Sequence, residues 1–109
     1  MEKRRYEVGK LSELKPDRGK TVALGESGEE CTLFLHEGKV YAVGSLCPHQ
    51  NAPLDGAPSQ RGQVLCVRHF YCFELATGNC TTAGGYGIPT YEVTLEEDTI
   101  SVWNWDFDS

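Results

Sequence analysis

Two short stretches of the sequence each place a cysteine and a histidine one or two residues apart. Cys47 and His49 lie in LCPHQNAPLDG, and Cys66 and His69 follow in LCVRHFYCF. Thiolate and imidazole are both good ligands for borderline-soft metals. A set of two sulfur and two nitrogen donors therefore indicates either a zinc site or an iron–sulfur cluster.

The distribution of the donors between the two stretches separates these options in part. Zinc fingers typically keep cysteine with cysteine and histidine with histidine, whereas here each stretch carries one of each. A mixed arrangement suits a two-iron centre in which two cysteines hold one iron and two histidines hold the other. Two loops at the tips of neighbouring hairpins would face one another across such a centre.

The elements that must position these loops are short β-strands. Apolar and polar residues alternate, with turn signals about every ten positions. The pattern predicts hairpins from 31–36 with 39–43, from 62–67 with 70–82, and within 90–105 around a turn at Glu97-Asp98. One helical turn is expected in KLSELKP, capped by Ser12. Many short strands with almost no helix predict an all-β fold, an antiparallel β-sandwich or partial barrel.

Residues 47–61, CPHQNAPLDGAPSQR, interrupt this pattern. The segment holds three of the chain's five prolines and no strand-forming run. Loops of this length inside a compact domain are usually functional or disordered. Because this loop carries the first cysteine–histidine pair, the sequence favours a functional loop.

Length and charge limit the classes of partner. A chain of 109 residues fits a single domain, 1–109, and its net charge of −6 argues against nucleic acid or an anionic membrane as partner. No apolar run approaches the ~18 residues of a membrane-spanning helix, and the basic start EKRRYEVGK lacks the apolar stretch of a signal peptide. We therefore expect a soluble, cytoplasmic protein.

The remaining cysteines have a simpler interpretation. Five cysteines, an odd number, without a CxxC motif argue against a disulfide framework and against a thioredoxin-like redox pair. Cys31, Cys72 and Cys80 are predicted to be buried free thiols, with a cross-strand pairing of Cys72 and Cys80 as the alternative.

Three aromatic residues near the end of the chain, and one further histidine, complete the candidates. Trp103, Trp105 and Phe107 alternate at the period of a strand, which predicts an aromatic face packed on the core or on a neighbouring subunit. His36 ends a predicted strand and is expected to be exposed.

The two stretches together resemble the cluster-binding loops of Rieske 2Fe-2S proteins, whose motifs are CxH and CxxH. The similarity runs more loosely from about Tyr6 to Val102. It extends beyond the ligands to residues Pro48, Ala52, Leu54, Gly56, Phe73, Thr77 and Gly78. The resemblance implies a Rieske fold with a small cluster-binding subdomain at about 45–75.

The resemblance also implies a ligand set for one 2Fe-2S cluster. Cys47 and Cys66 would bind the inner iron, and His49 and His69 would bind the outer iron near the surface. This chain departs from the family at Phe70, which stands directly after the second histidine where the family usually has glycine. Glycine there permits a backbone conformation that phenylalanine resists.

Other positions carry an expectation about the reduction potential. High-potential members link the two loops by a disulfide, at positions occupied here by Ala52 and Arg68. They also place serine and tyrosine hydroxyls near the bridging sulfur, where this chain has Tyr71 and Phe73. Phe73 has no hydroxyl and Tyr71 is too long to replace the serine. We therefore expect a low-potential centre, near the bottom of the Rieske range of ~−150 to +300 mV.

The resemblance implies an electron carrier and not an enzyme. Once His49 and His69 are used by the cluster, only His36 remains, so no mononuclear iron triad can be built within the chain. The implied role is that of a soluble, low-potential Rieske ferredoxin. It would be a monomer that carries one electron at a time from a flavin-dependent reductase to a terminal oxygenase, such as a ring-hydroxylating dioxygenase. The alternatives are the small subunit of an assimilatory nitrite reductase and a zinc-stabilised interaction module without redox activity.

Overall fold

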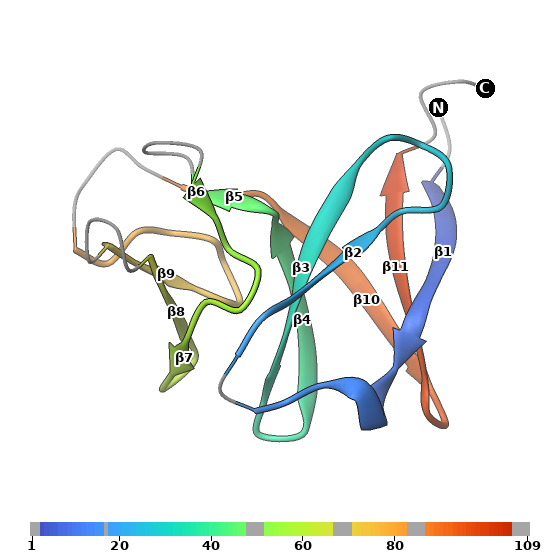
Figure 1. Ribbon diagram of the computed structural model, residues 1–109, viewed down its shortest axis with the longest axis horizontal. Helices are drawn as coiled ribbons and strands as arrows, with labels where there is room; N and C mark the ends of the chain where they lie inside the picture. The colour runs from blue at the N-terminus through green and yellow to red at the C-terminus, as the bar shows by residue number, and fades with distance from the viewer. Residues whose placement is uncertain (1–2, 17, 48–51, 67–70, 83–86, 106–109) are drawn as a thin grey trace.

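The computed structural model describes residues 3–16, 18–47, 52–66, 71–82 and 87–105, and in these ranges the chain forms β-strands and one 3-10 turn. Figure 1 shows a large sheet with two small sheets beside it. The all-β prediction is confirmed. The elements are β1 (Lys3–Lys10), η1 (Leu11–Glu13), β2 (Lys20–Ala23), β3 (Glu30–His36), β4 (Lys39–Gly44), β5 (Leu46–Cys47), β6 (Ala52–Pro53), β7 (Ser59–Gln60), β8 (Gln63–Cys66), β9 (Tyr71–Glu74), β10 (Thr90–Glu96) and β11 (Thr99–Trp105).

The large sheet has six strands in the order β1-β11-β10-β4-β3-β2, and each neighbouring pair is antiparallel. Its hairpins β3–β4 and β10–β11 were predicted from the sequence, whereas strands β1 and β2 were not. Strands β3 and β4 meet at Glu37-Gly38, where both residues have positive φ, 51° and 77°. Strands β10 and β11 meet at Glu97-Asp98. Two positive φ angles in a two-residue connection match the right-handed twist of the strands that it joins.

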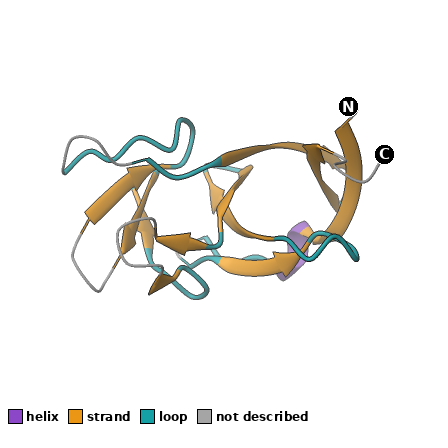
Figure 2. Ribbon diagram, turned by 90° about the horizontal axis from the view of Figure 1, so that it is seen from above, coloured by secondary structure: helices purple, strands orange, loops and turns teal. Residues whose placement is uncertain are grey.

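The sheet curls so that its two ends approach each other, as the view in Figure 2 shows. The ring of Tyr6 on β1 packs against Gly25 in the connection between β2 and β3. It fills the space that a side chain at residue 25 would occupy. Asn104 of β11 donates a hydrogen bond of 2.5 Å to the carboxylate of Glu29 in the same connection. These contacts join opposite edges of the sheet and give it the form of a partial barrel.

Strand β3 is buried on both of its faces. Cys31 and Leu33 point into a core inside the curled sheet, which also contains Ile100 and Val102. Phe34 and Thr32, which alternate with them, point the other way, and Phe34 belongs to a second core. Since a strand that is covered on both sides shows no alternation, this explains the nearly continuous apolar run CTLFL.

The second core joins the large sheet to the two small ones. β5 pairs with β6, and β7, β8 and β9 form a three-stranded sheet in that order. Leu54, which follows β6, packs in one cluster with Val64 of β8, Phe73 of β9 and Val43 of β4. All four side chains are at most 1% exposed. A shared core therefore fixes the small sheets against β3 and β4.

Two local predictions were wrong. The segment 47–61 is not free of strands, because it contains β6 and β7, whose two-residue lengths fall below what alternation can reveal. The single helical turn exists as η1, but Ser12 does not cap it. Lys10 occupies the N-cap position of this turn, and the Ser12 hydroxyl donates instead to the Asp98 carboxylate at 3.0 Å.

Cys31, Cys72 and Cys80, all among the described residues, form no disulfide, but only Cys31 is fully buried. Cys72 and Cys80 are half-buried. The backbone of Cys80 forms an isolated antiparallel β-bridge with that of Phe73, and the Thr81 amide donates to the Cys72 carbonyl at 2.9 Å. Because successive residues of a strand face opposite sides, Cys80 lies on the side of Phe73 and Cys72 lies on the other. This placement does not favour a disulfide between them.

Trp103 lies on the outer face of the six-stranded sheet, opposite to the buried Ile100 and Val102 of the same strand. Its indole Nε1 donates to the hydroxyl of Thr94 at 3.2 Å. The predicted aromatic face is thus not on the core side at this position, and Phe107 lies outside the described residues.

His36 is half-buried, not exposed, because its ring lies beside the turn at Gly62. No helix among the described residues is long and apolar enough to cross a membrane.

Candidate metal centre

Cys66 is the last residue of β8, and its side chain is 2% exposed. It packs in the second core with Val64 and Phe73 and forms no disulfide. Across the ladder it pairs with Tyr71, the first residue of β9. The four residues 67–70, which connect the two strands, therefore begin directly after a buried thiol.

Cys47 has the equivalent position in the other small hairpin. It is the last residue of β5 and pairs with Ala52, the first residue of β6. Here too a connection of four residues, 48–51, follows the cysteine. Each predicted cysteine ligand is thus the last paired residue before a four-residue connection. His49 and His69, and also Phe70, lie outside the described residues.

Backbone hydrogen bonds hold the bases of both hairpins. The Leu54 amide donates to the Ser45 carbonyl at 2.9 Å, which closes the chain around β5 and β6. The Leu65 amide donates to the Pro58 carbonyl, also at 2.9 Å, in the three-stranded sheet. Leu54 and Val64 also pack in one apolar cluster. The short strands that end at Cys47 and Cys66 are therefore held rigidly against each other.

A glycine after β9 connects the three-stranded sheet to the segment before β10. Gly78 has φ of +80°, its amide donates to the Glu74 carbonyl, and its carbonyl accepts from the Ile88 amide, both at 2.8 Å. A Cβ at this position would collide with the backbone carbonyl oxygen of Ile88. The position therefore requires glycine, which gives a physical reason for the Thr77-Gly78 dipeptide noted in the sequence.

An exposed apolar residue that the sequence analysis missed lies directly before Cys47. Leu46 is 45% exposed and pairs with the exposed Pro53 across the β5–β6 ladder. Both border a depression of about 350 Å³ that the carboxylates of Glu30 and Asp55 also line. In the sequence, a leucine beside a cysteine motif is read as a core residue. Its exposure becomes visible only when the register of this two-residue strand is known.

The described residues alone do not assemble the predicted ligand set. No three cysteine, histidine or carboxylate side chains gather at one point within the described ranges. The two predicted histidines belong to the connections 48–51 and 67–70. What the structure adds is the matched position of the two cysteines and the water-excluded environment of the Cys66 thiol.

A comparison with protein families matches residues 4–104 to the Rieske [2Fe-2S] domain. The chain belongs to the Rieske 2Fe-2S family. The curated relatives of the chain differ strongly in length. Apoptosis-inducing factor 3 of Mus musculus is 28% identical over 97 residues, which cover 88% of this chain and 14% of that protein. The ferredoxin component of an alkene monooxygenase system from Xanthobacter autotrophicus strain Py2 is 31% identical over 74 residues, 67% of this chain and 55% of that protein. The chain thus spans about a seventh of the length of the curated relatives that it matches first.

Solved Rieske structures share the fold over nearly the whole chain. A protein assigned as the NADH-dependent nitrite reductase small subunit of Mycobacterium tuberculosis is 25% identical, with a TM-score of 0.86 over 97% of this chain and 99% of that one. The ferredoxin of carbazole 1,9a-dioxygenase from Nocardioides aromaticivorans IC177 is 26% identical, with a TM-score of 0.81 over 90% and 95%.

Membership in the Rieske family identifies the cofactor as a Rieske-type 2Fe-2S cluster. The described residues fit this group. The buried Cys66 thiol at the end of β8 would be a suitable donor for an iron that is kept from water, and Cys47 ends β5 at the matched backbone position.

Proposed function

We propose that the chain is a ferredoxin that carries one electron at a time from a flavin-dependent reductase to a terminal oxygenase. The observation that carries this proposal is the likeness to the carbazole dioxygenase ferredoxin, which is 26% identical and is covered over 95% of its length. The alkene monooxygenase ferredoxin component, at 31% identity, supports the same assignment. We further propose a cytoplasmic monomer that forms transient complexes with these partners.

Four residues are proposed to hold the cluster. Cys47 and Cys66 would bind one iron and His49 and His69 the other, as the CxH and CxxH motifs imply. When bound, a 2Fe-2S cluster accepts and releases one electron. The proposal also treats 1–109 as one domain with a cluster-binding subdomain at about 45–75, because the small hairpins share a core with β3 and β4.

The protein's own residues would exclude water from the centre, fix the ends of the two connections and provide a surface for a redox partner. Leu54, Val64 and Phe73 exclude water from the side on which Cys66 lies. The pairing of Cys66 with Tyr71, and of Cys47 with Ala52, fixes the separation between the ends of each connection. Leu46, exposed beside Cys47, supplies apolar surface on which a redox partner can dock.

Spectroscopy of the purified protein tests the cluster, and a reconstituted chain tests the role. We expect a red-brown protein whose reduced form gives a rhombic EPR signal. With an NADH-dependent flavin reductase and an oxygenase of the carbazole dioxygenase class, we expect NADH oxidation that depends on this chain. A colourless protein containing zinc would support the interaction module and would contradict the ferredoxin.

The small subunit of a nitrite reductase is a second candidate. It is favoured by the likeness to the Mycobacterium tuberculosis protein, which matches 97% of this chain with a TM-score of 0.86. A stable complex with a nitrite reductase large subunit, seen as co-elution in size-exclusion chromatography, would favour this role. A ferredoxin instead forms complexes that exchange rapidly and do not co-elute.

A further inference from the structure

A groove of about 740 Å³ lies on the face of the β7-β8-β9 sheet that is turned away from the core. Its described lining includes Arg18, Arg61, Gln63, Leu65 and Cys72. Val64 and Phe73, which alternate with Leu65 and Cys72 along the same strands, are fully buried on the opposite face. The groove is therefore distinct from the cluster side of this sheet.

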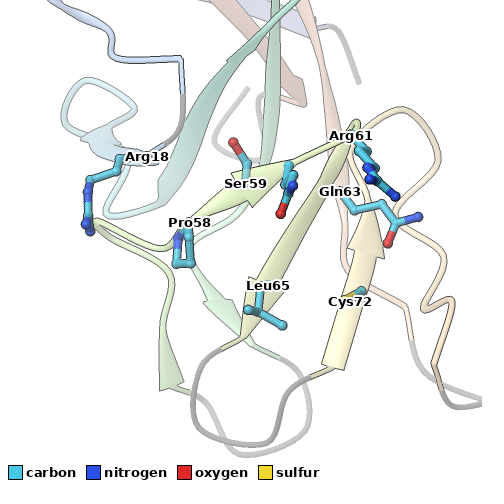
Figure 3. Close-up of a pocket in the computed structure, with 8 residues that line it drawn as sticks. Arg18, Pro58, Ser59, Arg61, Gln63, Leu65 and Cys72 are labelled. Atoms are coloured by element: carbon cyan, nitrogen blue, oxygen red, sulfur yellow. The ribbon is translucent and has the colours of Figure 1, made fainter.

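The charge of the groove is opposite to that of the chain. The protein carries 16 acidic and 10 basic residues, yet the described lining contains two arginines and no carboxylate. Figure 3 places Arg18 at one end and Arg61 at the other. The register puts Glu74 opposite Gln63, but Glu74 does not belong to the described lining.

The two arginines are held in different ways. The guanidinium of Arg18 donates from Nη1 to the Gly56 carbonyl at 3.1 Å, which keeps it at its end of the groove. Arg61 is exposed in the β7–β8 turn with φ of +55°, and within the described ranges its guanidinium forms neither an ion pair nor a hydrogen bond. Each remains able to bind a carboxylate in the bidentate geometry that guanidinium favours.

The floor between them is apolar with amides at its rim. Leu65 and Cys72 are cross-strand partners, and both are half-buried. The Gln63 Oε1 accepts from the Thr81 hydroxyl at 3.2 Å, so its amide group is left to donate. A ligand that fills the groove would place acidic groups at both ends and an apolar group in the middle.

We propose that this groove binds an extended acidic segment of a partner protein. One carboxylate pairs with Arg18, another pairs with Arg61, and an apolar side chain between them covers Leu65 and Cys72. A single small anion can pair with one guanidinium but cannot cover the apolar floor as well. The site goes beyond the proposed electron carrier, because it adds a partner contact on a face other than that of the cluster.

Fluorescence anisotropy with the cluster-loaded protein tests the proposal. The probe is the fluorescein-labelled peptide Asp-Leu-Glu-Val-Asp-Leu-Glu, compared with Asn-Leu-Gln-Val-Asn-Leu-Gln. We expect only the acidic peptide to bind. Its affinity should fall with added salt, because exposed charge pairs are screened over a Debye length of about 8 Å at physiological ionic strength.

Arg61 provides a variant that keeps the fold. Arg61→Asn gives Asn before Gly62, the preferred pair for this turn, while it removes the cation. We expect peptide binding to weaken about threefold to tenfold, and Arg61→Asp to weaken it further. Lys3→Gln is the matched control, because it also removes one surface cation but lies on β1, at the far end of the six-stranded sheet (Figure 1).

Two further measurements locate the peptide. Alkylation of Cys72 with iodoacetamide, followed by mass spectrometry, should slow when the acidic peptide is present, whereas the buried Cys31 stays unreacted throughout. Equal binding of both peptides, or equal losses in Arg61→Asn and Lys3→Gln, would overturn the proposal. A dimer in sedimentation that Arg61→Asp dissolves would also overturn it, in favour of a second copy of the chain as the occupant.

Discussion

The amide of Ile88 donates a hydrogen bond of 2.8 Å to the carbonyl of Gly78, and the two backbones lie too close for any side chain at residue 78. Gly78→Ala should therefore destabilise the fold by about 2–4 kcal/mol, through an unfavourable φ and the loss of this contact. The measurement is the free energy of unfolding in urea. Gly28→Ala is the control, because Gly28 has a similar φ of +84° but open space around it. It should cost only about 1 kcal/mol, and equal losses in both variants would refute the steric argument.

The cysteines differ in their predicted importance for the cluster. Cys47→Ser and Cys66→Ser should abolish the visible absorption and the EPR signal, because each removes a thiolate ligand. Cys72→Ser should leave both spectra intact, since its side chain faces away from the second core. Iron analysis per protein chain checks the same expectation. If Cys72→Ser lost its iron and Cys66→Ser kept it, the proposed ligand set would be wrong.

The reduction potential should respond to a hydroxyl at residue 73. We expect a midpoint below about +100 mV for the unaltered protein, within the lower part of the Rieske range. Phe73→Tyr should raise it, because a hydroxyl near the bridging sulfur stabilises the reduced cluster. Phe34→Tyr adds a hydroxyl to the same core from β3 and serves as the control for the cost of burying it. A midpoint that rises equally in both variants would show a general effect of core polarity.

Exposed Leu46 should matter for contact with the redox partner but not for the cluster. Leu46→Gln is expected to slow electron delivery by the reductase about threefold to tenfold, with an unchanged midpoint potential. Leu95→Gln provides the comparison, because Leu95 is 40% exposed but lies on β10. The measurement is the rate of reduction of each variant by the reductase, followed by stopped-flow absorbance at several protein concentrations. Identical rates for both variants would exclude Leu46 as a docking residue.

Alkaline pH should destabilise the protein through Cys31. Burial raises the pKa of this thiol from 9.0 to about 12. The unfolded chain therefore loses this proton at lower pH than the folded one. The stabilisation is complete below pH 9 and should be lost above it, by up to about 1.4 kcal/mol per pH unit, as pH rises toward 12. Burial also raises the pKa of Tyr91, which adds to the effect. Urea unfolding of Cys31→Ala at the same pH values checks this expectation. The variant lacks the thiol and the Cys31 charge that also raises the pKa of Tyr91, so it should show a shallower pH dependence.

The sequence predicted the hairpins well because alternation and turn residues are local signals. Strands β3, β4, β10 and β11 appear within one or two residues of their expected bounds. It failed for β6 and β7, since two-residue strands exist only through pairing with distant partners. The strand that carries Cys66 was predicted as 62–67, one residue longer at each end than β8. The exposure of Leu46 and the arginine groove could not be predicted, because both depend on which face of a short strand meets the second core.

The contact between the segment before β2 and the loop after β6 has a consequence for electron transfer. The Gly19 amide donates to the Ala57 carbonyl and the Gly56 amide donates to the Gly19 carbonyl, both at 2.9 Å. The Thr21 amide donates to the Asp55 carboxylate at the same distance. These bonds clamp residues 55–57 to the large sheet, so the backbone of this segment has little room to relax when the charge of the centre changes. A carrier built in this way would have a low reorganisation energy, because the nuclei around it need hardly move between the oxidised and reduced states.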